Sequence, residues 1–302
     1  WGKEPLASVG KVVDVNNGRL YFDMEFLGME KVNPAWKFQV WNAMDPDTLT
    51  PGTEGGKEFW PQFDRIEQIT PNTLRFHPMN IASHLSSIGE VYRIRHRVYD
   101  AHAVLIGDTN HLTLDNIIIY SAPGHGYWVH GDTHHLEIVN SKITLRPGSS
   151  RRITVTADGI HFGQSQGYFR MVGNDFGFGG DDCLNIHDNI SMGIRVLDDK
   201  TLIAENVYQW RNPFQAGDLV EIRQPDLSPT GFSSTLERVS YNHPAAQVRL
   251  TFADTLPVDL DENSILFNRR YDSSNFVIKD NYFHQNRARG ILLQAGNGLV
   301  EG

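Results

Sequence analysis

A short apolar motif recurs along the 302-residue chain from residue 110 onward, and it restricts the possible folds more than any other feature. In each copy an apolar residue is followed five positions later by another, with an Asn or Asp turn in most copies between them. The equivalent apolar positions are Leu114, Ile138, Met171 and Ile278. The first two lie 24 residues apart, and residues 297–300 begin a further copy about 22 residues after the last anchor.

Repeats of this length, built from short strands and polar bends, are typical of a parallel β-helix, in which each turn covers the apolar interior of the turn before it. We therefore predict an all-β chain whose main part is a right-handed parallel β-helix. The four anchors are expected to stack as one interior ladder.

Two larger spacings predict departures from the regular repeat. Ile138 and Met171 are 33 residues apart, which predicts an enlarged loop at 146–152. Met171 and Ile278 are 107 residues apart, about 83 more than one turn, so a segment of domain size is inserted there. Residues 190–273 alternate like antiparallel strands and are expected to form this insertion.

The beginning of the chain also has short alternating runs, broken by Asn-Gly, Pro-Gly and Gly-Gly turns, which predict small antiparallel β structure. We read this segment and the insertion as two small β-barrels or sandwiches carried by one β-helix. The predicted domains are 1–97 (barrel-like), 98–189 (β-helix, first part), 190–273 (inserted barrel) and 274–302 (β-helix, continued).

Charge and composition exclude several function classes. A net charge of −9 argues against a nucleic-acid backbone or an anionic membrane as partner, because either needs a basic face. No apolar run reaches the roughly 18 residues of a membrane span. Cys183 is the single cysteine, which excludes an intrachain disulfide and leaves the compartment undecided. Trp1 opens directly into a polar segment without a signal peptide, and 299–302 stop within a repeat, so we expect both ends to be cut from a longer chain.

Three acidic residues beside glycines are the candidate catalytic groups. Asp158 precedes Gly159, and Asp181 follows 23 residues later, about one turn along, with Asp182 directly after it. Aligning the turns on their anchors places four residues in one column, and we expect these to be His125, Asp158, Asp181 and Arg289. Adjacent turns lie about 4.8 Å apart, so carboxylates from neighbouring turns would face one substrate. Asp182 is expected to reach the same groove through a bulge.

Paired carboxylates at this separation suit proton transfer to and from a glycosidic bond, in which one acid stays protonated and another activates water. Two other interpretations remain open. Asp next to Gly is common in turns, and clustered Asp residues can bind calcium as in pectate lyases.

The acidic motifs resemble those of known β-helix hydrolases. Asp158 with Gly159, followed by residues 180–183, resembles the catalytic core of polygalacturonase-type enzymes. The string 181–187, with 287–294 after a barrel insertion, is more similar to glycoside hydrolase family 110. That family comprises bacterial exo-acting α-1,3-galactosidases known for removing the terminal galactose of the blood-group B antigen.

The resemblance implies an inverting mechanism without a metal or other cofactor, with Asp158 as general acid and Asp181 and Asp182 as the base that positions water. It also implies a secreted or periplasmic bacterial enzyme. The sequence departs from polygalacturonases because no Gly-His-Gly follows the acidic pair, whereas the Gly-His-Gly at 124–126 precedes it by two turns, and Arg-Ile-Lys does not occur.

Six further residues are candidates for binding the substrate. Arg289 is expected to bind sugar hydroxyls or to lower the pKa of a carboxyl group, with a surface salt bridge as the alternative. Trp128 suits an apolar platform for a pyranose ring or a place in the core, and the histidines suit either the groove or the structure. The candidates are His125, Trp128, His161, His187, Arg289 and Gln294. His130, His134 and His135 lack a carboxylate or cysteine partner at metal-ligand spacing.

The sequence therefore predicts an exo-α-galactosidase whose partner is a glycan with terminal α-galactose. The alternatives are a polygalacturonase-like enzyme that cleaves in mid-chain, a calcium-dependent lyase and a non-catalytic β-helix that adheres to glycans. Three clustered acids argue against adhesion, which does not need them. The pattern leaves the oligomeric state open.

Overall fold

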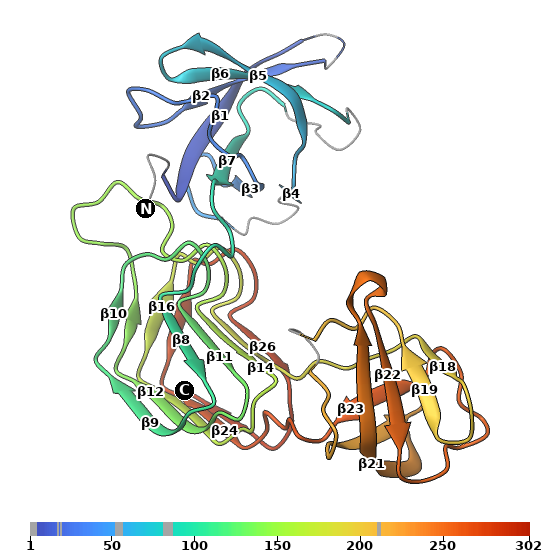
Figure 1. Ribbon diagram of the computed structural model, residues 1–302. Helices are drawn as coiled ribbons and strands as arrows, with labels where there is room; N and C mark the ends of the chain where they lie inside the picture. Colours follow the sequence, from blue (N-terminus) through green and yellow to red (C-terminus); the bar gives the residue numbers. More distant parts are fainter. Residues whose placement is uncertain (1–4, 17, 19, 52–56, 81–86, 210–212) are drawn as a thin grey trace.

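The computed structural model describes residues 5–16, 18, 20–51, 57–80, 87–209 and 213–302 (Figure 1). Trp1, where we expected the chain to open without a signal peptide, lies outside these ranges. Within them the chain is all-β, as predicted, and a 3-10 turn, η2 (His243–Ala245), interrupts the strands. None of the described residues belongs to a helix of the length and apolarity needed to cross a membrane.

The N-terminal part is an antiparallel seven-stranded sheet with the strand order β4-β3-β7-β1-β2-β6-β5. Its core is aromatic, because Trp41, Phe22 and Phe76 pack edge to face or stacked at centroid distances of 5.1–5.8 Å. The strands are β1 (Ala7–Val15), β2 (Phe22–Phe26), β3 (Val40–Met44), β4 (Glu58–Phe59), β5 (Phe63–Thr70), β6 (Thr73–Pro78) and β7 (Val91–Arg95).

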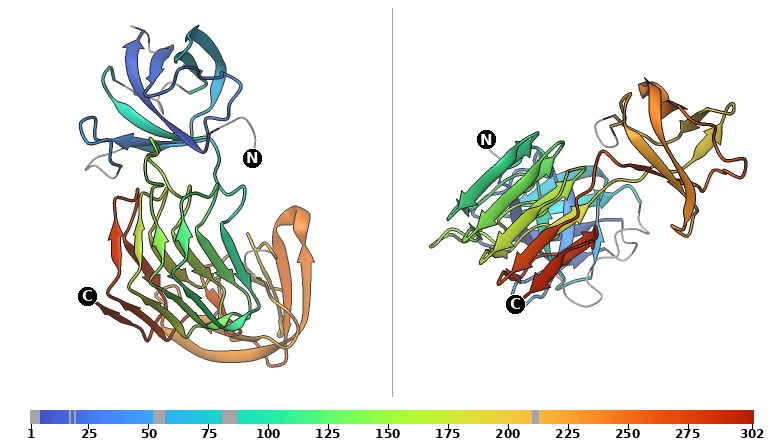
Figure 2. Two further views of the ribbon diagram at one scale, coloured as in Figure 1. Left: turned by 90° about the vertical axis from the view of Figure 1, so that its left-hand side faces the viewer. Right: turned by 90° about the horizontal axis from the view of Figure 1, so that it is seen from below.

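The central part consists of three parallel sheets, and the chain passes through them in the same order on each turn (Figures 1 and 2). The first sheet holds β8 (Val104–Gly107), β11 (Tyr127–His130), β14 (Ile160–Gly163), β17 (Leu184–His187) and β26 (Ile291–Gln294). The second holds β9 (Asn110–Asp115), β12 (His134–Val139), β15 (Phe169–Val172), β24 (Phe276–Lys279) and β27 (Leu299–Glu301). The third holds β10 (Ile118–Ile119), β13 (Lys142–Ile143), β16 (Asp175–Gly177) and β25 (Tyr282–His284). We call these three sheets the stacked region.

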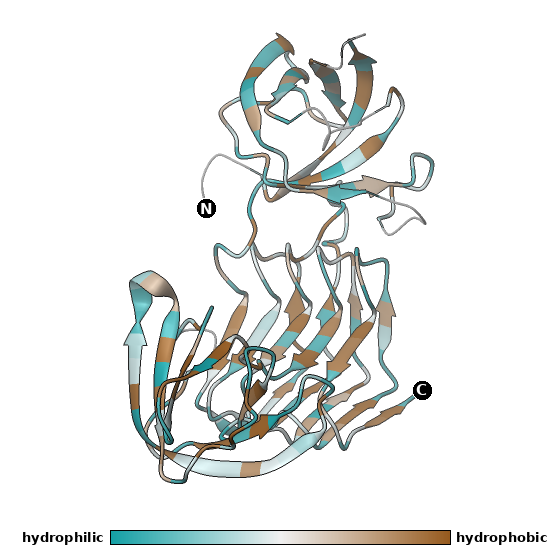
Figure 3. Ribbon diagram, turned by 90° about the vertical axis from the view of Figure 1, so that its right-hand side faces the viewer, coloured by the Kyte–Doolittle hydropathy of each residue, from teal (hydrophilic) through white to brown (hydrophobic). Residues whose placement is uncertain are grey.

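The predicted ladder of apolar anchors is confirmed. Leu114 is in register with Ile138, Ile138 with Met171, and Met171 with Ile278. Val300 continues the ladder, so residues 297–300 do begin a further copy. The side chains of Ile138, Met171 and Ile278 are at most 2% exposed and belong to one core shared by the three sheets. Hydrophobic segments recur along the strands of the stacked region (Figure 3). Burial of apolar side chains between successive turns therefore holds the stack together.

Left-handed residues end the strands of the second sheet at equivalent points. Asn116, Asn140, Gly173 and Asp280 have φ values of 56°, 49°, 67° and 52°. Asn, Asp and Gly tolerate this conformation best, which explains why the motif carries them after the second-sheet strand. In the last two copies the Asn comes one residue later, and the Asn174 side chain donates to the Ile138 carbonyl at 2.8 Å. Asn thus adopts the left-handed backbone conformation in the first two copies, whereas in the third it donates a side-chain hydrogen bond to the neighbouring turn.

A six-stranded antiparallel sheet lies between β17 and β24 in the sequence and has its own core. Its strands are β18 (Ile194–Val196), β19 (Thr201–Ala204), β20 (Leu219–Arg223), β21 (Pro229–Asn242), β22 (Gln247–Phe252) and β23 (Ile265–Asn268). The two ends of this segment are hydrogen-bonded to each other, because the Asp188 carboxylate accepts from Ser273 N at 2.8 Å and Ser273 Oγ at 2.7 Å. As a result β15 pairs directly with β24 across the insertion.

Truncating one anchor of the ladder will destabilise the stacked region. Met171 is 1% exposed between Ile138 and Ile278, so Met171→Ala leaves a cavity that neighbouring turns fill only in part. We expect a loss of about 2–5 kcal/mol in the free energy of unfolding. Urea unfolding monitored by circular dichroism measures it, with Tyr168→Ala, an exposed residue of the same turn, as control. Equal stability of the two variants would contradict the role of the ladder.

Candidate active site

The first parallel sheet sets the register of the candidate catalytic residues. Tyr127, Ile160, Leu184 and Ile291 are aligned on β11, β14, β17 and β26. Two positions earlier, therefore, His125, Asp158, Asp182 and Arg289 form the column. Our expectation that Asp181 belongs to this column is wrong, because the buried pair Leu184 and Ile186 on β17 fixes the register and brings Asp182 into line.

Glycines next to the column allow the turns to approach each other closely. A Cβ atom on Gly126 would lie 2.5 Å from the Gly159 carbonyl oxygen, and one on Gly159 would lie 2.5 Å from the Cys183 carbonyl oxygen. Any larger residue would push the turns apart. The glycines after His125 and Asp158 are thus required by the stacking of the turns, whereas Cys183 stands at the equivalent position after Asp182.

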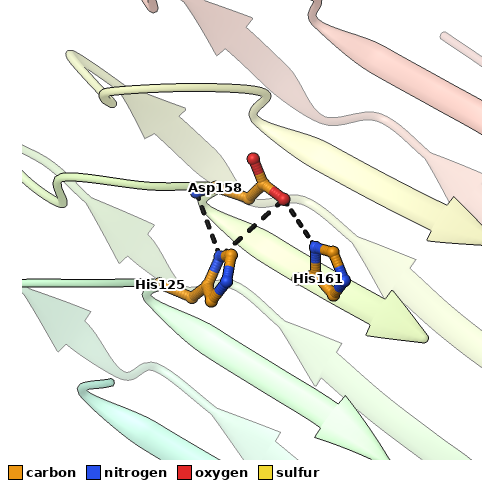
Figure 4. Close-up of side chains that lie close together, drawn as sticks. All are labelled: His125, Asp158 and His161. Atoms are coloured by element: carbon orange, nitrogen blue, oxygen red, sulfur yellow. Dashed lines mark hydrogen bonds and ion pairs between the residues drawn. The ribbon is translucent and has the colours of Figure 1, made fainter. Parts of the chain in front are cut away.

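Asp158 is a buried carboxylate held in its charged form. Its Oδ2 lies 2.7 Å from His161 Nδ1 and 3.7 Å from His125 Nδ1 (Figure 4), and its Oδ1 accepts the Asp182 N–H at 3.1 Å. Burial raises the pKa of Asp158, but the hydrogen bond from His161, the charge of that histidine and the backbone N–H of Asp182 outweigh it and bring the pKa below the usual 3.8. Asp158 is therefore ionised at neutral pH.

His125 is the neutral neighbour of this carboxylate. Burial, with the nearby charge of His161, lowers the pKa of His125 to about 3. Its Nδ1 accepts the backbone N–H of Asp158 at 3.1 Å, which requires the imidazole proton to be on Nε2. His125 therefore fixes the backbone at Asp158 and leaves its Nε2–H to donate.

Asp182 is 1% exposed and forms an ion pair with Arg289. Arg289 Nε donates to Oδ1 at 2.8 Å, Nη2 donates to Oδ2 at 2.9 Å, and the backbone N–H of Arg289 donates to Oδ1 at 2.9 Å. This fork geometry satisfies a buried carboxylate well. The structure thus pairs Arg289 with a buried acid of the candidate site.

Asp181 is in a different electrostatic state. Burial and the nearby charge of Asp158 raise the pKa of Asp181 to about 6, although Arg287 donates to its Oδ1 at 2.8 Å and opposes the rise. One carboxylate oxygen from each of Asp158, Asp181 and Asp182 lies within 4.8 Å of the other two. The cluster therefore contains a carboxyl group that is partly protonated near neutral pH, next to one that is ionised.

Two sets of ligand atoms among the described residues are close enough to surround a cation, namely His125, Asp158 and His161, and the three acids. In the first set His125 Nδ1 already accepts a backbone N–H. In the second set Arg289 engages both oxygens of Asp182. At least one ligand of each set is therefore already engaged by a hydrogen-bond donor, and we route no step through a metal.

A cavity of about 740 Å³ lies beside the acids, within the range usual for small-molecule sites. None of the three acids is among its lining residues, but His125 and His161, which both lie close to Asp158, are part of its wall, so Asp158 lies directly behind this wall. The Trp128 ring lies 4.5 Å from the His102 ring, in an aromatic surface suited to the apolar face of a sugar. The other lining side chains are Tyr99, Asp108, His130, Gln164, His187, Asn189, Pro213, Arg270 and Tyr271.

Most of the predicted substrate-binding residues line this cavity. His125, Trp128, His161 and His187 do so, whereas Arg289 pairs with Asp182 and Gln294 is exposed on β26, in register with His187. Of the three histidines considered for a metal, His130 lines the cavity, while His134 and His135 lie at the start of β12 with rings 5.0 Å apart.

Sequence reasoning missed His102, Arg270 and Tyr271. His102 occupies the column of His125 one turn earlier, since Val104 aligns with Tyr127, and extending the register would have found it. Arg270 and Tyr271 follow β23, and Arg270 Nε lies 3.2 Å from Asp132 Oδ1 of the stacked region. No periodic signal relates these residues to the turns.

Comparisons with known proteins give low but extended similarity. The chain is 22% identical over 246 residues to alpha-1,3-galactosidase B of Phocaeicola vulgatus, which covers 78% of this chain and 40% of that protein. It is 24% identical over 218 residues to alpha-1,3-galactosidase A of Shewanella woodyi, covering 70% and 35%. It is 27% identical over 165 residues to alpha-1,3-galactosidase B of Akkermansia muciniphila, covering 53% and 20%.

The chain thus spans less than half the length of these curated relatives. No family model matches it. The similarities support the resemblance to glycoside hydrolase family 110 that residues 181–187 carry.

Proposed function

We propose that this chain is the catalytic part of a glycoside hydrolase that removes terminal α-1,3-linked galactose from glycans with inversion of configuration. The observation that carries the proposal is the cluster of three acids, with the pKa of Asp181 raised and that of Asp158 lowered, next to a cavity whose wall includes the two histidines that contact Asp158. Two neighbouring carboxyl groups with separated pKa values can serve as the general acid and the general base of one reaction. The names of the similar proteins support the choice of galactose.

We also infer that the stacked region is a right-handed parallel β-helix. The repeated passage through three parallel sheets supports the helix, and the strong preference of parallel crossovers for the right hand supports its handedness. On this view 1–97 and 190–273 are domains attached to a helix formed by 98–189 and 274–302. From the resemblance we further propose a bacterial enzyme that is secreted or periplasmic.

Asp181 is the proposed general acid. With a pKa of about 6 it is half protonated near pH 6 and still protonated in about a tenth of molecules at pH 7, and it can donate that proton to the leaving oxygen. Asp158, ionised and oriented by His161, is the proposed base that takes a proton from the attacking water. The resemblance implied the reverse, with Asp158 as acid, and the electrostatics of the site favour exchanging the two roles.

Inversion requires water as the nucleophile in place of a carboxylate. Both oxygens of Asp158 and of Asp182 already accept hydrogen bonds, which a covalent glycosyl ester would disrupt. This supports a water-holding role for both. The nearest oxygens of the acids, within 4.8 Å, are closer than the roughly 6.5–9.5 Å typical of inverting pairs, so stereochemistry is the decisive measurement.

We expect hydrolysis of Gal-α-1,3-Gal to release β-galactose first. Proton NMR of the anomeric signals, followed before mutarotation, measures this directly, and Asp181→Asn serves as the inactive control. Release of α-galactose first would mean retention and overturn the mechanism. Turnover of polygalacturonate with no release of galactose would favour the enzyme that cleaves in mid-chain.

A further inference from the structure

A charged side chain from the N-terminal sheet reaches the acidic cluster. Glu58, on β4, lies with its Oε2 2.8 Å from Arg287 Nε. The same guanidinium donates from Nη2 to Asp181 Oδ1 at 2.8 Å. Arg287 thus bridges a carboxylate of the seven-stranded sheet and the proposed general acid.

Glu58 is held in this position by its own sheet. Asn42 Nδ2 on β3 donates to Glu58 Oε2 at 2.6 Å, and Arg95 Nη2 on β7 lies 3.6 Å from the same oxygen. Arg95 also donates from Nη1 to the Thr156 carbonyl of the stacked region at 2.6 Å. The Glu58 side chain is 28% exposed and that of Arg95 only 2%, so water reaches the Glu58 end of this network and is excluded from the Arg95 end.

We propose that Glu58 is a positioning residue of the active site. It shares the positive charge of Arg287 with Asp181, so Arg287 compensates the negative charge of ionised Asp181 only in part. The inference rests on the proposed role of Asp181 as general acid. It makes the N-terminal sheet part of the catalytic apparatus.

The physical reason is the division of one positive charge between two carboxylates. An arginine next to a carboxyl group lowers its pKa, and a second carboxylate on the same arginine weakens that effect. Asp181 also faces the negative charges of Asp158 and Asp182 and the positive charge of Arg95, while Arg289 is paired with Asp182 and Tyr99 lies nearby. The raised pKa of Asp181 agrees with incomplete compensation by Arg287 and Arg95.

Direct titration of Asp181 tests the proposal without depending on activity. In protein labelled at the aspartate carboxyl carbons, NMR gives the midpoint of each carboxyl group, and Asp181→Asn identifies the signal. We expect Glu58→Gln to lower the midpoint of Asp181 by about one unit, because Arg287 then acts on Asp181 alone. Arg287→Gln should raise it.

The matched control is Glu67→Gln, which removes a carboxylate of the same sheet that pairs with His77, and it should leave the midpoint unchanged. The alkaline limb of the pH dependence of kcat/KM should lie at lower pH in Glu58→Gln than in wild type, by the same shift as the midpoint of Asp181. An Asp181 midpoint equal in wild type and Glu58→Gln overturns the inference. Absence of hydrolysis by wild type would overturn the proposed function, while the titration still decides the role of Glu58.

Discussion

The Asp181→Asn variant will hydrolyse natural α-galactosides on the order of 10³-fold more slowly than wild type, because an amide cannot protonate the leaving oxygen. With p-nitrophenyl α-galactoside the loss will be much smaller, since that leaving group departs with little protonation. The ratio of kcat/KM values for the two substrates measures the effect. Equal losses on both substrates would contradict the role of Asp181 as acid.

Stability provides the folding control for this variant. A carboxyl group whose pKa rises from 3.8 to about 6 on folding stabilises the protein below about pH 4 and loses that contribution as the pH rises through 6. At pH 7.5 ionised Asp181 therefore destabilises the folded state by up to about 3 kcal/mol. Asp181→Asn should accordingly raise the Tm at pH 7.5 and change it little near pH 4.

The Asp158→Asn variant will lose activity on both kinds of substrate by a similar factor, on the order of 10³. Water must be activated whatever the leaving group, and the amide at position 158 cannot accept the proton. The low pKa of Asp158 also predicts that wild-type activity falls only in strongly acidic solution.

The matched control is Asp175→Asn, an acid that pairs with His284 on the third sheet outside the cluster. It should keep wild-type activity. If Asp158→Asn instead retained activity only on p-nitrophenyl α-galactoside, Asp158 would be the acid and the exchanged assignment would be wrong.

The interior of the stacked region was predictable because its residues repeat. Leu114, Ile138 and Met171 occupy the same environment on successive turns, so the same kind of side chain returns at the same interval. The register of the acids was harder to predict, since Asp181 and Asp182 fit the spacing almost equally well. Only the alignment of Leu184 with Ile160 decides between them.

Contacts between segments that do not repeat leave no periodic pattern in the sequence. Glu58 and Arg287 lie far apart in the chain, and nothing periodic in the N-terminal sheet indicates that β4 ends at the acidic cluster. The pKa of Asp181 depends partly on such contacts, since Arg95 of the N-terminal sheet opposes its rise. The pKa of Asp158 is instead lowered by His161 on its own turn and Asp182 on the next. The sequence therefore indicated the acids as candidates, whereas the roles that we propose for each of them depend on their three-dimensional neighbours.

The hydrogen bonds between Asp188 and Ser273 have an evolutionary consequence. They join the two ends of the insertion. The turn of the stack can therefore keep its geometry when the length or sequence of the inserted segment changes. Pro213, Arg270 and Tyr271 of that segment nevertheless form part of the cavity wall. Changes in the inserted segment can therefore alter the ligand-facing wall of the cavity, while the carboxyl groups on neighbouring turns keep their spacing.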